Sequence, residues 1–379
     1  MIRVLVVEDS ATVREFLLDI LRSDPEIAVV GTAETGEEAL EAVERTRPDV
    51  ITMDVHMPKM NGFDATRRIM ESHPTPIVIV SAVDMADVAK AFWAIEAGAL
   101  AVLQRPYGMG HPAHDKTVAE LVQTVKVMSE VKVIRRWPRL RPVEVQPNVS
   151  PSAEFRLPLS ETQVKIVAMG ASTGGPPVLQ AILAALPRDF SVPVLLVQHI
   201  APGFTQSFAD WLAQSSSLPV QVAVHGQSVL PGHVYVAPDS FHMAIAAQGR
   251  VRLNSDEPEN GLRPSVSHLF RSVAHAYGPR AIGVLLTGMG KDGALELKLM
   301  KEQGAVTIAQ DRDTSVVHGM PGEAIKLGGA TYVLPPEKIR IALTSLLSGN
   351  GYGREPEISG AENTTESGKM LLRCDLSGK

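Results

Sequence analysis

Short apolar runs alternate with amphipathic segments from the first residues of the chain. Residues 2–7 are nearly all apolar, and residues 11–22 repeat apolar side chains every three or four positions, which is typical of a strand followed by a helix. The alternation predicts strands at 2–7, 27–32, 50–53, 77–80 and 100–103, and helices at 11–22, 36–45, 63–70, 88–96 and 114–135. This order predicts a doubly wound, flavodoxin-like parallel sheet that binds ligands at the carboxyl ends of its strands.

The alternation resumes after a proline-rich interval. Strands are predicted at 165–169, 194–197, 281–286, 305–309 and 331–334, and helices at 177–186, 204–214, 265–276, 293–303, 321–327 and 336–347. Strand-like pieces at 220–224, 233–236, 243–246 and 250–253 indicate an antiparallel excursion, with a hairpin turn at Gln248-Gly249. We expect a mostly parallel, Rossmann-like second domain.

These patterns divide the chain into four parts. The first domain covers residues 1–125, and residues 126–162 hold the end of a helix and a linker with five prolines between residues 137 and 160. The second domain covers residues 163–348. Residues 349–379 are polar and aperiodic, which predicts a disordered tail.

Composition places the chain among ordinary globular proteins, with 45% hydrophobic and 21% charged residues. No uninterrupted apolar stretch reaches the ~18 residues of a membrane span, and no basic leader precedes the first strand. The single cysteine, Cys374, cannot form an internal disulfide, which agrees with a reducing compartment. We therefore expect a cytoplasmic protein that does not insert into membranes.

Charge adds one distinction between the domains. Residues 1–106 carry 10 Lys and Arg against 18 Asp and Glu, a net charge of −8 within a total of −6. No segment has the basic stripe that nucleic-acid binding needs, so no nucleic-acid partner is expected. The acidic first domain instead suits a divalent cation.

Acidic residues follow two strands of the first domain that this fold makes neighbours. Glu8 and Asp9 end the first strand and Asp54 ends the third, so their carboxylates should converge on Mg²⁺. One of them could also accept a phosphoryl group as an acyl phosphate. Taken singly, each acid is better explained as an exposed loop residue or a helix cap, and only the combination is specific.

Residues 1 to about 125 resemble the receiver domain of two-component response regulators. The resemblance rests on Val-Glu-Asp-Ser at 7–10, Met-Asp-Val-His-Met-Pro-Lys-Met-Asn-Gly at 53–62 and Val-Ser-Ala at 80–82. It implies that Asp54 accepts the phosphoryl group, that Mg²⁺ is held by Glu8, Asp9, Asp54 and the backbone carbonyl of His56, and that Ser81 and Arg105 respond to phosphorylation. Arg105 stands where the family has lysine, and Val102 where it has an aromatic residue.

A tight turn in the second domain is the first candidate for catalysis. Residues 165–169 form an apolar strand that runs into Gly170-Ala171-Ser172-Thr173-Gly174-Gly175, before a helical pattern from 177. Ser172 could be a nucleophile or a helix N-cap, and we expect it to serve as both. A phosphate cradle is disfavoured because two prolines follow Gly175 where a Walker motif needs Lys and then Ser or Thr.

Two further strand ends supply the partners that a serine nucleophile needs. His199 follows the strand at 194–197, and Asp292 lies in the Gly-rich turn after the strand at 281–286. A serine needs a base such as histidine, and an aspartate orients that base, which predicts a Ser172-His199-Asp292 triad. The backbone N–H groups of Thr173 and Met289 are candidate oxyanion donors. Taken singly, His199 is better explained as a strand-end histidine bonded to a loop, and Asp292 before Gly293 as a turn or N-cap residue.

The second-domain motifs resemble those of chemotaxis protein-glutamate methylesterases, the CheB family. The matching stretches are Gly-Ala-Ser-Thr-Gly-Gly-Pro at 170–176, Gln-His-Ile at 198–200 and Thr-Gly-Met-Gly-Lys-Asp-Gly at 287–293. The resemblance implies hydrolysis of glutamate methyl esters on methyl-accepting chemoreceptors with release of methanol, deamidation of receptor glutamines, and no cofactor in the esterase site. It also implies phosphorylation of Asp54 by the chemotaxis histidine kinase, which relieves inhibition by the receiver.

Two local departures and two alternatives accompany this resemblance. Ser267 stands where the family commonly has aspartate, and His318 where it commonly has tryptophan. A binding module with a vestigial esterase domain is suggested by Arg105 and Val102, but Ser172, His199 and Asp292 are all present. A DNA-binding response regulator would need a helix-turn-helix and a basic face, and neither is visible in the sequence.

Overall fold

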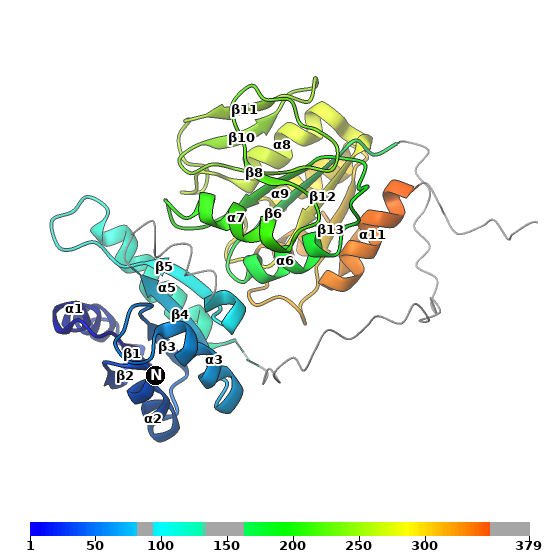
Figure 1. The fold of residues 1–379 in the computed structure, drawn as a ribbon. Coiled ribbons are helices and arrows are strands. Elements are labelled where there is room, and N and C mark those ends of the chain that lie inside the picture. The colour runs from blue at the N-terminus through cyan, green and yellow to red at the C-terminus, as the bar shows by residue number, and fades with distance from the viewer. Residues whose placement is uncertain (82–93, 132, 134–162, 349–379) are drawn as a thin grey trace, which may run out of the picture.

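The computed structural model describes residues 1–81, 94–131, 133 and 163–348. It contains two α/β bodies, one drawn from blue to cyan and one from green to orange in Figure 1. The start of the helix expected at 88–96, most of the linker and the tail at 349–379 lie outside the described residues; residues 94–97 are helical.

The first body is a five-stranded parallel sheet in the order β2-β1-β3-β4-β5. This is the flavodoxin-like order, which places the ends of β1 and β3 side by side. Its strands are β1 (Ile2–Val7), β2 (Ile27–Ala33), β3 (Val50–Met53), β4 (Ile77–Ser81) and β5 (Ala101–Gln104). Its helices are α1 (Ala11–Arg22), α2 (Gly36–Thr46), α3 (Gly62–Ser72) and α5 (His114–Ser129).

Helix α5 ends six residues before the predicted position at 135. The Glu130 and Val131 amides donate to the carbonyls of Val127 and Met128, three residues back, at 3.3 and 3.1 Å. The Ser129 hydroxyl also donates to the Lys126 carbonyl at 2.7 Å. Hydrogen bonds to the carbonyl three residues back commonly end a helix. The spacing of apolar residues in the sequence does not show where such bonds form, so the predicted end at 135 was too late.

The second body is a seven-stranded sheet in the order β14-β13-β12-β6-β7-β9-β8, with every neighbouring pair parallel. Its strands are β6 (Ile166–Ala171), β7 (Val194–Gln198), β8 (Val220–Val222), β9 (Val234–Val236), β12 (Ala281–Leu285), β13 (Val306–Gln310) and β14 (Tyr332–Leu334). Its helices are α6 (Gly175–Ala184), α7 (Thr205–Ser215), α8 (Val266–Tyr277), α9 (Ala294–Glu302), α10 (Met320–Lys326) and α11 (Pro336–Ser348), with a short 3-10 helix at Gly278–Arg280.

The antiparallel excursion is present but shorter than the strand-like pieces suggested. Only β10 (His242–Ile245) and β11 (Val251–Asn254) pair antiparallel, in a separate hairpin. Strands β8 and β9 pair parallel inside the main sheet, because residues 223–233 carry the chain back to start β9 in the same direction. Apolar content locates a strand, whereas its direction depends on this connection.

Two apolar layers cover the second sheet, because alternate side chains of each strand point to opposite faces. On β6, Val167 and Met169 join the core beneath α6, α7 and α11, whereas Ile166 and Ala168 join the core beneath α8, α9 and α10. The β10–β11 hairpin packs on the α8 side. These layers fix β6, β7 and β12 in the middle of the sheet.

Several contacts join the two bodies. The Glu96 carboxylate accepts hydrogen bonds from Trp211 Nε1 on α7 at 2.9 Å and from Gln180 Nε2 on α6 at 3.2 Å. Ile95 belongs to the same apolar cluster as the α6 and α7 side chains, and Val316 and Val317 pack against the cluster beneath α1 and α5. The first body therefore contacts two helices and one loop of the second body.

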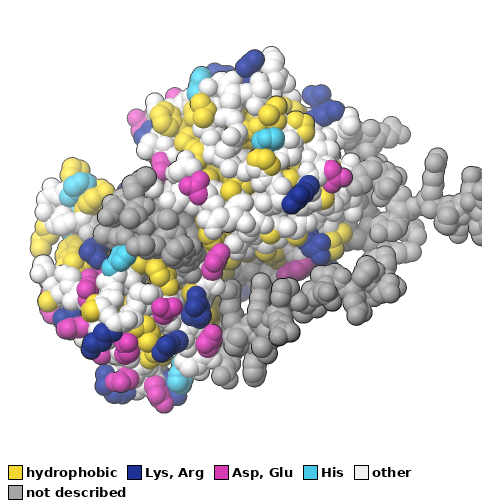
Figure 2. All heavy atoms as spheres, viewed as in Figure 1, with side chains coloured by type: hydrophobic (Ala, Val, Ile, Leu, Met, Phe, Trp, Pro, Cys, Tyr) yellow, Lys and Arg dark blue, Asp and Glu magenta, His cyan; other side chains and the backbone are white. Residues whose placement is uncertain are grey.

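On the face that Figure 2 shows, acidic and basic side chains are interspersed over the first body. Among the described residues, none of the helices combines the length and the apolar character that a membrane crossing requires.

Candidate functional site

The acidic cluster of the first domain assembles as the strand order predicts. Oxygen atoms of Glu8, Asp9 and Asp54 lie within 4.8 Å of one another. The Asp54 amide donates to the Val7 carbonyl at 2.9 Å, which ties the end of β3 to the end of β1. Glu8 and Asp54 are buried and Asp9 is exposed. Three convergent carboxylates are the oxygen ligands that Mg²⁺ prefers, so the donor set fits this cation.

Arg105 enters the same cluster from the end of β5. Its Nη2 lies 3.1 Å from Glu8 Oε2 and 3.5 Å from Asp54 Oδ1. Burial, with the Asp54 charge next in size, raises the pKa of Glu8 to about 7 even though Arg105 lowers it. Burial also raises the pKa of Asp54, and Arg105 again opposes the change. Burial disfavours the ionised form of both acids, and a bound cation would offset that cost.

The other predicted receiver residues border this cluster. Ser81 is buried at the end of β4, and its carbonyl accepts a hydrogen bond from the Arg105 amide at 2.8 Å. The His56 side chain is exposed, and its charge contributes to lowering the pKa of Asp54. The Nε of Arg105 is a buried donor without a hydrogen-bond partner in the described part of the chain.

The Ser172 turn connects the central strand β6 to α6. The Ser172 amide donates to the Thr287 carbonyl at 3.0 Å, and the Ser172 carbonyl accepts from the Gly175 amide at 2.8 Å. Gly288 approaches closely, since a Cβ at that position would lie 2.7 Å from Ser172 Cβ. The turn is therefore held between the ends of β6 and β12.

Ser172 does not cap α6, which corrects one of the two roles expected for it. The helix begins at Gly175, with prolines in its first turn, and its N-cap is Gly174 at φ 76°. Proline suits the first helical positions because those amides have no partner within the helix, so the helix starts two residues before 177. Within the described residues the Ser172 hydroxyl makes no hydrogen bond, which leaves it free of a capping role.

His199 follows β7, the strand next to β6. Its amide donates to the Ala171 carbonyl at 3.0 Å, and its Nε2 lies 2.9 Å from Asp292 Oδ2. Residues 93 positions apart thus form a direct side-chain pair. An ionised carboxylate only accepts hydrogen bonds, so Nε2 carries the hydrogen and Nδ1 is left as the basic nitrogen.

Asp292 is buried, yet the surrounding donors keep it ionised. Besides His199, it accepts hydrogen bonds from the Ser265 hydroxyl at 2.8 Å, the Val266 amide at 2.7 Å and the Ser267 amide at 3.1 Å. Burial alone would raise its pKa, but hydrogen bonds, led by the one from His199, lower that pKa to about 2. The first turn of α8 therefore acts as an anion-binding site for this side chain.

The sequence reasoning missed several residues that shape this site. Gln198 Nε2 donates to the Ser172 and His199 carbonyls, both at 2.8 Å, and so joins the two loops. The Thr287 hydroxyl lies 3.0 Å from the Thr173 carbonyl. Ser265 is the N-cap of α8, and a serine before a helical pattern is a recognisable sign of such a cap. Nothing in the sequence connects this cap to Asp292.

The candidate oxyanion donors belong to the two loops that meet at Ser172, one after β6 and one after β12. Thr173 directly follows Ser172, and Met289 follows Gly288, where an added Cβ would lie 2.7 Å from Ser172 Cβ. In the described part of the chain, neither the Thr173 amide nor the Met289 amide donates a hydrogen bond. The Met289 side chain is 40% exposed, so it is not a core residue.

Comparisons with known proteins agree with both halves of this arrangement. The "Response regulator receiver domain" profile matches residues 4–111, and the "CheB methylesterase" profile matches residues 167–343. A protein-glutamate methylesterase/protein-glutamine glutaminase of Nitrosospira multiformis is 57% identical over 93% of this chain and 98% of the relative. One of Geobacter metallireducens is 58% identical over 91% of this chain and 99% of the relative.

Solved structures match each half separately. The catalytic domain of the Thermotoga maritima CheB methylesterase is 44% identical and covers 49% of this chain and 100% of that structure, with a TM-score of 0.47. The response regulator domain of Thermotoga maritima CheB is 38% identical and covers 35% of this chain and 98% of that structure, with a TM-score of 0.32.

Fold and site together define a response regulator whose output domain is an α/β hydrolytic domain. The near-complete overlap with relatives of high identity is more specific. The chain belongs to the CheB methylesterase family.

Proposed function

We propose that this protein hydrolyses glutamate methyl esters on chemoreceptors, releases methanol, and is activated by phosphorylation of its receiver domain. The observation that carries the proposal is the arrangement at the ends of β6, β7 and β12, where Ser172, the His199–Asp292 pair and two unbonded amides come from adjacent strands. The names of the two bacterial relatives described above support the same activity.

In the reaction, the Ser172 oxygen attacks the ester carbonyl while His199 Nδ1 takes its proton. The amides of Thr173 and Met289 stabilise the negative oxygen that forms. Collapse of this intermediate breaks the bond to the methoxy group, which leaves as methanol with the proton from His199. Water, deprotonated by His199, then releases the glutamate carboxylate and restores Ser172. Asp292 stabilises the imidazolium in both halves of the reaction.

The same groups also fit deamidation of receptor glutamines. A primary amide passes through the same acyl intermediate, and ammonia takes the place of methanol as the leaving group. The relatives carry the glutaminase activity in their names as well. We therefore include protein-glutamine deamidation in the proposal.

For the receiver, we propose Asp54 as the phosphoacceptor and a chemotaxis histidine kinase as the donor. Glu8, Asp9, Asp54 and the His56 carbonyl would hold Mg²⁺, which neutralises charge on the phosphoryl oxygens. The Asp54 oxygen forms the new bond to phosphorus while the bond to the kinase imidazole breaks. Ser81 and Arg105 lie at the neighbouring strand ends, where they can contact the added group.

Regulation would act through the contacts between the two bodies. Glu96 and Ile95 connect the receiver to α6 and α7, and α6 directly follows the Ser172 turn. Phosphorylation that loosens these contacts would open the site to a receptor helix. A cytoplasmic location fits this scheme, because both the kinase and the methylated receptor segments would lie there.

A direct assay tests this proposal. Purified protein is incubated with receptor membranes carrying labelled methyl groups, with and without acetyl phosphate and Mg²⁺, and released methanol is counted. Ser172→Ala should lower release by about 10⁴-fold or more. Asp54→Ala should abolish the response to acetyl phosphate and leave basal release intact.

Matched controls use exposed residues of the same type. Ser255→Ala and Asp64→Ala change surface side chains and should behave like the wild type. Methanol release that survives in Ser172→Ala would refute the mechanism. Release that ignores acetyl phosphate in the wild-type protein would refute the regulation.

A further inference from the structure

Ser265 has an unusual position for a helix-capping residue, because it is completely buried and contacts the acid of the proposed triad. Its hydroxyl oxygen accepts the His268 amide at 3.4 Å, which is the capping bond, and lies 2.8 Å from Asp292 Oδ1. A hydroxyl has one hydrogen to donate, and only the carboxylate can accept it here. The shorter of the two bonds therefore serves Asp292 and not the helix.

The donors around Asp292 divide between its two oxygens. Oδ1 accepts from the Ser265 hydroxyl and the Ser267 amide, whereas Oδ2 accepts from His199 Nε2 and the Val266 amide. Bonds to both oxygens fix the rotation of the carboxylate about its Cβ–Cγ bond. Oδ2 is thereby held toward the imidazole.

The first turn of α8 is itself held firmly. Val266 is fully buried, and its methyl groups fill the space beside Gly170 and Gly293, where a Cβ would come within 2.3 and 2.4 Å. The Ser267 hydroxyl accepts the Gly293 amide at 2.9 Å. The position of Ser265 is therefore set relative to both β6 and the Asp292 loop.

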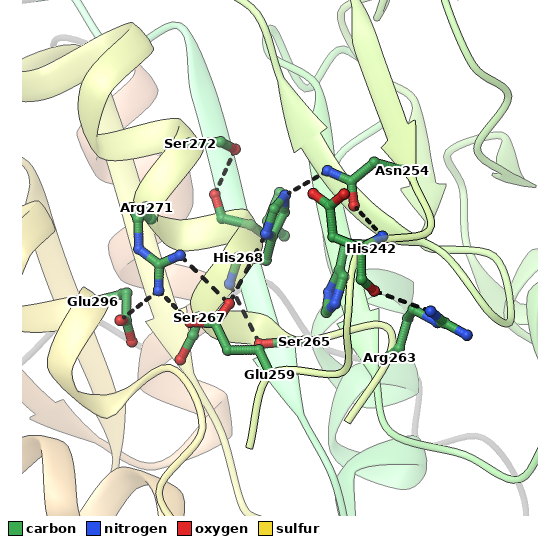
Figure 3. Close-up of polar contacts among 12 residues, drawn as sticks. His242, Asn254, Glu259, Arg263, Ser265, Ser267, His268, Arg271, Ser272 and Glu296 are labelled. Atoms are coloured by element: carbon green, nitrogen blue, oxygen red, sulfur yellow. Dashed lines mark hydrogen bonds and ion pairs between the residues drawn. The ribbon is translucent and has the colours of Figure 1, made fainter. Parts of the chain in front are cut away.

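A cluster of charged residues braces the next turn of the same helix. Arg271 pairs with Glu259 and, at 3.0 Å, with Glu296 on α9, as Figure 3 shows beside Ser265 and Ser267. His268 Nε2 lies 3.3 Å from Asn254 Nδ2 on β11. The His268 ring also stacks on the ring of His242 on β10, with the ring centroids 4.7 Å apart. Helix α8 is thus attached to the hairpin and to α9.

We propose that Ser265 is a positioning residue for the hydrolysis: its hydroxyl fixes the Asp292 carboxylate so that Oδ2 holds His199 in the tautomer with Nδ1 free for Ser172. This inference rests on the proposed esterase function. Loss of the Ser265 hydroxyl removes the shorter of the two bonds to Oδ1, so the carboxylate is held less firmly and the imidazole loses its fixed orientation. The effect falls on turnover and not on substrate binding, because Ser265 is buried behind Asp292.

The test separates this role from ordinary helix capping. Glycine caps helices nearly as well as serine, so Ser265→Gly removes the hydroxyl with little loss of helix stability. We expect kcat for methanol release to fall by ~10- to 100-fold with KM changed less than twofold. Ser265→Thr retains the hydroxyl and should recover at least half of the lost kcat on a logarithmic scale.

Ser272→Ala is the matched control on the same helix. The Ser272 hydroxyl also serves a structural bond, accepting the Ile245 amide at 3.0 Å, but it does not contact Asp292. This variant should lower the melting temperature at least as much as Ser265→Gly and leave kcat within about twofold of the wild type. Equal kcat in the two variants would overturn the proposal.

A second measurement does not depend on turnover. Nitrogen NMR of ¹⁵N-histidine-labelled full-length protein reports the His199 tautomer, and we expect a single Nε2–H form in the wild type and exchange between tautomers in Ser265→Gly. An unchanged Nε2–H signal in the variant would overturn the positioning role. If wild-type protein releases no methanol but the NMR change occurs, the proposed function fails and the positioning role stands.

Discussion

Arg105 contacts two carboxylates of the receiver site at once, and its charge sets how readily they ionise. Its Nη2 lies near both Glu8 and Asp54, and it lowers the pKa of each against the effect of burial. Since only ionised Asp54 is a nucleophile, Arg105 extends phosphorylation toward lower pH. The same Nη2 atom makes both contacts, so one nitrogen placed between the two acids acts on both.

Replacement of Arg105 by glutamine tests this effect. Removing the positive charge raises the pKa of Asp54, so at a given pH a smaller fraction of Asp54 is ionised. The acid limb of phosphorylation by acetyl phosphate, measured at saturating Mg²⁺, should move to higher pH. Arg45→Gln, which changes an exposed arginine on α2, should leave the limb in place. If the acid limb of the pH profile is unchanged or moves to lower pH in Arg105→Gln, Arg105 does not lower the pKa of Asp54.

Sequence patterns were informative about reactive residues and less so about the residues that hold them. Asp9 and Asp54 lie together because they follow the neighbouring strands β1 and β3. His199 and Asp292 lie together because they follow β7 and β12, the two strands that flank β6. Gln198 was not predicted, because a glutamine that donates to two carbonyls has no sequence signature. The capping role expected for Ser172 was wrong, because α6 begins at Gly175 and its N-cap is Gly174, two residues beyond the serine.

At the scale of elements, the contact between β6 and α8 decides where Asp292 is held. Val266 packs into the gap left by two glycines, Gly170 on β6 and Gly293 beside Asp292. The gap exists only because neither position has a Cβ. Packing and catalysis are therefore linked through one buried valine.

Gly170→Ala tests this link. The added Cβ would lie 2.3 Å from Val266 Cγ1, so α8 must move away from β6. We expect a loss of ~1–3 kcal/mol in the free energy of unfolding, measured by urea denaturation, and a fall in methanol release. The penalty should shrink when Gly170→Ala is combined with Val266→Ala, because the second change removes the colliding methyl groups.

A control shows whether the collision is responsible. Gly108→Ala adds a Cβ where nothing lies within 4 Å and should leave stability within about 0.5 kcal/mol of the wild type. Additive effects of Gly170→Ala and Val266→Ala would argue against direct contact.

Element positions followed well from apolar periodicity, and element directions did not. Most predicted strands and helices lie within two residues of the observed ones, because buried parallel strands are continuous apolar runs. Strands β8 and β9 were expected in an antiparallel excursion but lie parallel in the sheet. Direction depends on how residues 223–233 cross the molecule, which is a tertiary property.

Across the whole molecule, a carboxylate from the receiver contacts α6, the helix that follows the Ser172 turn, and the neighbouring helix α7. Glu96 accepts hydrogen bonds from Trp211 on α7 and Gln180 on α6. Hydrogen bonds to a charged group contribute more than neutral ones, so Glu96 should favour the docked arrangement.

The domain division at residues 125, 162 and 348 remains a prediction.

Glu96→Ala should release part of the inhibition in unphosphorylated protein. A loss of ~1 kcal/mol in docking corresponds to roughly a fivefold change in the docked population ratio, so basal methanol release should rise by up to that factor. Stimulation by acetyl phosphate should fall correspondingly, since the phosphorylated protein is already open. Glu41→Ala, an exposed change on α2, is the control. Unchanged or lower basal release in Glu96→Ala would argue against a restraining contact.

The strand order has a consequence for how this enzyme can vary. The loops with Ser172, His199 and Asp292 all leave three adjacent inner strands, β6, β7 and β12, while β8 and β14 form the two borders of the sheet. Insertions after the border strands displace no reactive group, whereas one added residue after an inner strand moves a reactive group by up to ~3.5 Å. Diversity in receptor recognition is therefore expected to accumulate at the margins of the sheet, with the three central loops constant in length.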